Sequence, residues 1–105
     1  MTRYSHLIEA VRGLKKRGFD HELLLKEEKI HCPDNDKYYS ADEMSIVEYH
    51  LYYMQTKPYY ISIFFAVEFN EFTKGMIISS YGVYGDIKIM EFMDKVKILS
   101  PETNN

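Results

Sequence analysis

The chain has 105 residues, 46% of them hydrophobic and 28% charged, which is typical of one globular domain and not of a disordered segment. Its formal net charge of −3 argues against a nucleic-acid partner, because phosphate binding needs a cationic face. No apolar run reaches the roughly 18 residues of a membrane span, and the N-terminus lacks the apolar stretch of a signal peptide. The single cysteine, Cys32, cannot form an internal disulfide, so we expect a cytoplasmic protein with no membrane partner.

The first segment, residues 4–17, has the pattern of an amphipathic helix. Its apolar side chains recur at helical spacing and form one stripe: Leu7, Ile8, Val11 and Leu14. Three basic residues end the segment, where they suit the negative end of the helix dipole. Gly18 follows at the position where many helices end in a left-handed residue, so we expect the helix to stop there.

Residues 19–32 alternate as two extended segments, and Glu27 and Glu28 are the turn between them. After a polar loop, Ser40 and Glu43 have the S-x-x-E spacing of a capping box. This spacing predicts a single helical turn just before the next extended segment.

The stretch 45–81 predicts a three-stranded antiparallel meander, because apolar and polar residues alternate along it with few interruptions. A two-residue turn at Asn70 and Glu71 would place Phe65 opposite Met76 and Ile63 opposite Ile78. A loop over 55–58 would place Leu51 opposite Ile61 and Tyr49 opposite Ile63. The register gathers an apolar face that we expect to form the core: Val47, Leu51, Ile63, Phe65 and Ile78.

A second helix is predicted near the C-terminus, where Ile89, Phe92, Met93 and Val96 are spaced at i, i+3, i+4 and i+7. Both helices must bury an apolar stripe, and the apolar sheet face is the available partner. We therefore predict an α+β two-layer sandwich in the order α-β-β-β-β-β-α. Its antiparallel sheet has four or five strands, and both helices lie on one face. Residues 1–99 are expected to form a single domain and 100–105 a flexible tail.

The predicted register leaves the outer sheet face without a cover from this chain. It carries aromatic side chains around a polar centre: His50, Tyr52, Tyr60, Ser62, Phe64, Ser79 and Tyr81. An exposed patch of this kind indicates an interaction. Three explanations remain open: a homodimer stacked sheet to sheet, coverage by the N-terminal hairpin or a displaced helix, and a small-molecule site on the tyrosines and His50.

No motif predicts a metal, a cofactor or a catalytic centre. The four histidines and Cys32 lack the spacing of zinc ligands, and no phosphate-binding or dinucleotide-binding glycine pattern is present. His50 could act as a general base with Glu48 beside it and Ser62 opposite, but a flat sheet supplies no evident oxyanion hole.

The run LIEAVRGLKKRGFDHELLLKEEKIHC, the S-x-x-E segment and the closing SSYGVYGD resemble a family of bacterial proteins of roughly a hundred residues. The family is uncharacterised, and some members carry an automatic label of phosphoribosylpyrophosphate synthetase. That enzyme needs a much longer α/β chain and an acidic ribose-phosphate loop, which this sequence lacks. The resemblance implies the order of elements and no functional residues.

We therefore expect a small non-enzymatic protein that binds through the outer sheet face, as a homodimer or with an unidentified protein or small-molecule partner. The alternative is a ligand-binding or enzymatic site around His50 and the row of Tyr52, Tyr60 and Tyr81.

Overall fold

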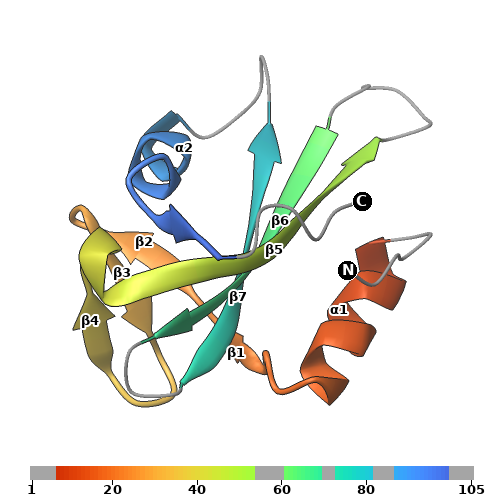
Figure 1. Cartoon of the computed structure of the whole chain (residues 1–105), viewed down its shortest axis with the longest axis horizontal. Coiled ribbons are helices and arrows are strands. Elements are labelled where there is room, and N and C mark those ends of the chain that lie inside the picture. The colour runs from red at the N-terminus through yellow and green to blue at the C-terminus, as the bar shows by residue number, and fades with distance from the viewer. Residues whose placement is uncertain (1–6, 54–60, 70–72, 82–86, 100–105) are drawn as a thin grey trace.

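The computed structural model describes residues 7–53, 61–69, 73–81 and 87–99, and within them it has an α+β architecture (Figure 1). The predicted α+β class is therefore confirmed, but the predicted two-layer sandwich is not. The elements in chain order are α1 Leu7–Lys16, β1 His21–Glu22, β2 Leu24–Lys26, β3 Lys29–Cys32, β4 Lys37–Tyr39, the 3₁₀ turn η1 Ala41–Glu43, β5 Met44–Tyr53, β6 Ile61–Phe69, β7 Lys74–Tyr81, α2 Ile87–Met93 and β8 Lys97–Ile98.

The strands form two sheets instead of the single sheet that we predicted. The main sheet has five strands in the order β1-β7-β6-β5-β8, and β2, β3 and β4 form a separate antiparallel sheet. The central meander of β5, β6 and β7 is antiparallel, as predicted. The two outer strands were not predicted as its neighbours: β1 pairs in parallel with β7, and β8 pairs in parallel with β5, each over two residues.

Both faces of the main sheet are covered, each by its own core. On one face, α2 and the second sheet pack over the meander, and the buried residues there include Ile46, Ile63, Phe65, Ile77 and Phe92. On the opposite face, α1 packs through a smaller set: Leu14, Phe19, Phe64, Ala66 and Met76. Figure 1 shows α1 and α2 on opposite sides of the main sheet.

The prediction that both helices share one face is therefore wrong. The reason lies in β6, whose residues 63–67 are buried on both faces, so that each face needs a cover. The displaced helix that we left open as a cover for the outer face is α1.

The strand register also differs from the predicted one. In β6 and β7, Phe64 pairs with Ile78 and Ile63 with Ser79, a shift of one residue. The Phe69 amide donates a hydrogen bond of 2.8 Å to the Thr73 carbonyl, so this hairpin closes one residue later than predicted. A one-residue shift moves every side chain of a strand to the other face, which explains why Ile78 leaves the predicted core face.

Two local predictions hold at the ends of elements. Gly18 has φ of 96° and follows α1. Around it the Phe19 amide donates to the Leu14 carbonyl at 2.9 Å, and the Gly18 amide donates to the Lys15 carbonyl at 3.1 Å. These two bonds define a Schellman motif, and Phe19 and Leu14 pack in the same core. The predicted turn at Ser40 is present as η1, where the Ser40 amide donates to Glu43 Oε1 at 2.9 Å.

Candidate functional site

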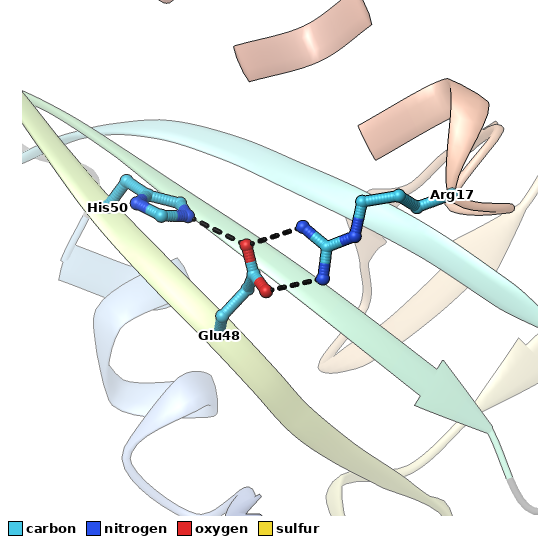
Figure 2. A network of polar contacts seen from close by, with 3 residues as sticks. All are labelled: Arg17, Glu48 and His50. Carbon is cyan, nitrogen blue, oxygen red and sulfur yellow. Dashed lines mark hydrogen bonds and ion pairs between the residues drawn. The ribbon is translucent and has the colours of Figure 1, made fainter. Parts of the chain in front are cut away.

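Glu48 of β5 is a buried carboxylate at the centre of a polar cluster on the sheet face under α1. Arg17 donates to it through two parallel hydrogen bonds, Nη1 to Oε1 at 3.0 Å and Nη2 to Oε2 at 2.7 Å (Figure 2). On its other side Oε1 lies 2.9 Å from Nε2 of His50. The Glu48 side chain is only 5% exposed, whereas His50 is 11% and Arg17 is 36% exposed. We call these three residues the Glu48 cluster.

An irregularity in β5 directs Glu48 toward α1. The pairing of β5 with β6 shifts between Ile46 and Glu48, as at a β-bulge around Val47. Ile46 belongs to the core under α2, so regular alternation would place Glu48 on that same face. The bulge reverses the alternation, and Glu48 pairs with Ala66 on the face that α1 covers.

The end of α1 supplies the cation. Because the Schellman motif stops the helix at Gly18 and anchors Phe19 in the core, Arg17 is held at the rim of the α1 interface. Its guanidinium carbon lies 5.7 Å from the centre of the Phe19 ring, a cation–π contact that helps to hold the side chain in place. From there it reaches across to β5 (Figure 2).

The electrostatics of the cluster favour an ionised Glu48. Burial by itself raises the pKa of a carboxyl, but the hydrogen bonds and charges of Arg17 and His50 outweigh burial and hold the pKa of Glu48 below its ordinary value. An ionised carboxylate only accepts hydrogen bonds, so Nε2 of His50 is its donor. The cluster therefore orients an imidazole and ties α1 to the sheet.

The structure brings together four of the seven residues that we predicted for the outer face. His50 pairs with Phe64 and Tyr52 with Ser62, and these four share the face under α1. Phe64 is fully buried there, so it is not available to a partner.

Two of the other three predicted residues, Ser79 and Tyr81, have ladder partners outside this group. Ser79 pairs with Ile63 and lies on the opposite face, because of the one-residue shift in the register. Tyr81 pairs with Ile61 in the strand ladder, and Tyr60 lies outside the described residues. The predicted arrangement of Ser62 opposite His50 is wrong, because Ser62 lies opposite Tyr52.

Arg17 is the member of the cluster that the sequence did not reveal. We assigned it to the basic end of a helix, which accounts for its position but not for its partner. One signal was present: Glu48 lies in a row with apolar residues, and a carboxylate that is buried among them needs a cation or several donors.

The other two described histidines also contact carboxylates. His21 Nδ1 lies 2.6 Å from Asp34 Oδ2, and His31 Nε2 lies 2.9 Å from Asp36 Oδ1. Across the described ranges, no group of three or more His, Cys, Asp or Glu side chains is arranged to hold a metal ion. None of the described helices is long and apolar enough to cross a membrane.

Apolar side chains are exposed along the β5 edge of the main sheet, on the side of α2. Tyr49 is 45% exposed, Leu51 is 41% exposed and Ile98 of β8 is 45% exposed. Tyr49 contacts Phe65 with ring centres 6.4 Å apart, and Ile98 is the ladder partner of Ile46, so both belong to this side. We call these three residues the β5–β8 strip.

Comparison of the chain with protein-family models, with curated proteins and with solved structures finds no match.

Proposed function

We propose that this protein is a small non-enzymatic interaction protein that forms a homodimer through the β5–β8 strip. The observation that carries the proposal is the exposure of Tyr49, Leu51 and Ile98, which together form an apolar edge beside a well-packed core. Tyrosine is enriched at protein interfaces, and a large exposed apolar patch usually marks an interaction site.

The Glu48 cluster supports a non-enzymatic role. The Glu48 carboxylate is hydrogen-bonded to Arg17 on one side and to His50 on the other, and the Glu48 side chain is almost wholly buried. A general base must reach the proton that it abstracts. A buried ion pair between a helix and a strand instead fixes where the helix docks.

A second copy of this chain is the partner that suits the strip best. The whole chain has a net charge of −3, so two copies repel each other unless they meet through uncharged surfaces. The three side chains of the strip carry no charge at neutral pH, and an apolar patch is complementary to itself across a two-fold axis.

The test is the oligomeric state as a function of protein concentration, measured by light scattering and sedimentation velocity. We expect the double variant Tyr49→Ser and Leu51→Ser to weaken the dimer by at least about tenfold. The matched control is Tyr38→Ser with Leu24→Ser, which removes the same residue types at 50% and 51% exposure on the second sheet. This control should keep the dissociation constant of the wild type.

A wild-type protein that stays monomeric up to high micromolar concentration contradicts the proposal. In that case the second candidate, a small-ligand site, gains support from the imidazole of His50, which Glu48 orients 6.2 Å from the ring of Tyr52. A ligand-induced rise in melting temperature that is lost in the variant His50→Gln would identify such a ligand site.

A further inference from the structure

The outer face of α1 and the adjoining start of β7 carry cations that make no ion pair with the described carboxylates. Arg12, Lys15 and Lys16 are exposed and lie at i, i+3 and i+4, so they project from one side of the helix. Lys74 of β7 joins them at the C-terminal end of α1, where its Nζ is 5.2 Å from the ring centre of Phe19. We call these four residues the α1 basic face.

The α1 basic face lacks carboxylate partners within the part of the chain that the structure describes. The chain has 16 acidic residues against 13 basic ones, yet none of the described carboxylates pairs with these four cations. Arg17, one residue beyond the helix, turns inward instead and takes Glu48. The helix dipole favours Lys15 and Lys16 in the last turn, and Lys74 lies over the Phe19 ring, but neither contact accounts for Arg12 in the middle of the helix.

We propose that the α1 basic face binds an acidic segment of another protein. Cations three and four residues apart on a helix match carboxylates at the same spacing on a partner helix. The argument is charge complementarity: a concentrated positive face on a chain of net charge −3 attracts carboxylates while the rest of the surface repels acidic chains.

Two other polyanions fit this face less well. Helices that lie on an anionic lipid surface also insert several apolar side chains into it, and Ile8 is the one exposed large apolar side chain among those that the structure describes on α1. Single-stranded nucleic acid binds where bases stack on exposed aromatic rings, and the described residues of α1 include no aromatic residue.

The test uses a fluorescent synthetic helical peptide with glutamates at i, i+4 spacing, titrated in fluorescence anisotropy at several salt concentrations. In the variant Arg12→Glu, Lys15→Glu and Lys16→Glu we expect affinity to fall roughly tenfold or more, and wild-type affinity to fall as salt rises. The matched control is Lys29→Glu, Lys95→Glu and Lys97→Glu, which changes the net charge equally at exposed sites away from α1. The control should bind the peptide like the wild type.

An equal loss in both triple variants overturns the proposal, because the effect would then belong to the net charge alone. Tighter wild-type binding to phosphatidylserine vesicles or to a single-stranded oligonucleotide than to the peptide overturns it as well. Circular dichroism and thermal melting of each variant show whether it is folded. A further variant replaces all four cations of the α1 basic face by glutamine, which removes their charge without reversing it. Its substitutions are Arg12→Gln, Lys15→Gln, Lys16→Gln and Lys74→Gln.

Discussion

At the scale of single residues, Glu48 connects β5 to the end of α1 through its hydrogen bonds with Arg17. It is a carboxylate in an apolar row, so its ionised form is tolerated only because Arg17 and His50 both contact it. The three side chains come from the end of a helix and from one strand, and the hydrogen bonds among them connect α1 to the sheet (Figure 2).

Replacement of Glu48 by Gln should therefore destabilise the protein by roughly 2–3 kcal/mol, since Arg17 and His50 lose the charge that both contact. Because the pKa of Glu48 is lowered in the folded state, its contribution is present above the pKa of the unfolded chain. It is lost as pH falls through the pKa in the folded state. Urea denaturation of wild type and variant between neutral and acidic pH measures the difference, which should shrink on acidification.

The control for this experiment is Glu22→Gln, which removes an exposed carboxyl from β1. Its effect on the free energy of unfolding should be small. A Glu48→Gln variant with the same stability and pH profile as the control would show that the cluster does not stabilise the fold.

At the scale of elements, the short strand β1 depends on a glycine in β7. Gly75 is the ladder partner of His21, and a Cβ atom there would lie 2.8 Å from the His21 carbonyl oxygen and 2.8 Å from Leu23 Cδ1. Backbone cannot move aside as a flexible side chain can, so Gly75→Ala should cost about 1–3 kcal/mol.

The comparison for this variant is Gly18→Ala, where an added Cβ meets only Lys74 Cδ at 3.6 Å. Its cost of about 1 kcal/mol comes from the left-handed backbone and not from crowding. Denaturation midpoints of the two variants test the difference, and a neutral Gly75→Ala would mean that β1 is not held against β7 as described.

The β2–β3 hairpin contains a turn that is strained by its residue types. Glu27 and Glu28 have φ of 47° and 68°, as both central residues of a type I′ turn require, and glutamate adopts this conformation at a cost. The variant Glu27→Asn with Glu28→Gly should stabilise the protein by about 1 kcal/mol in thermal or chemical denaturation. A double glutamine variant removes the two charges alone and should gain less; an equal gain would assign the effect to charge.

At the scale of the whole molecule, the sequence predicted those features that depend on local patterns. The end of α1 at Gly18, the turn at Glu27 and Glu28, and the central meander follow from residue spacing and are present. The separation of the hairpin into a second sheet depends on packing between distant segments, such as Tyr39 against Phe69, and no local pattern shows such contacts.

The outer face was predicted in part for the same reason. His50, Tyr52, Ser62 and Phe64 share a face because alternation within β5 and β6 is local. Ser79 was misplaced by one extra residue in a hairpin connection, and the cover over Phe64 comes from a helix far away in the sequence. The bulge near Val47, which directs Glu48 toward α1, has no distinctive residue such as glycine to announce it.

The two short parallel strands also imply an order of folding. The meander closes through short connections between neighbouring strands, whereas β1 with β7 and β8 with β5 join segments that are far apart along the chain. Such distant pairs cost more chain entropy to form, so we expect them to assemble after the meander. The effect of Gly75→Ala should then appear mainly as faster unfolding, with the refolding rate almost unchanged.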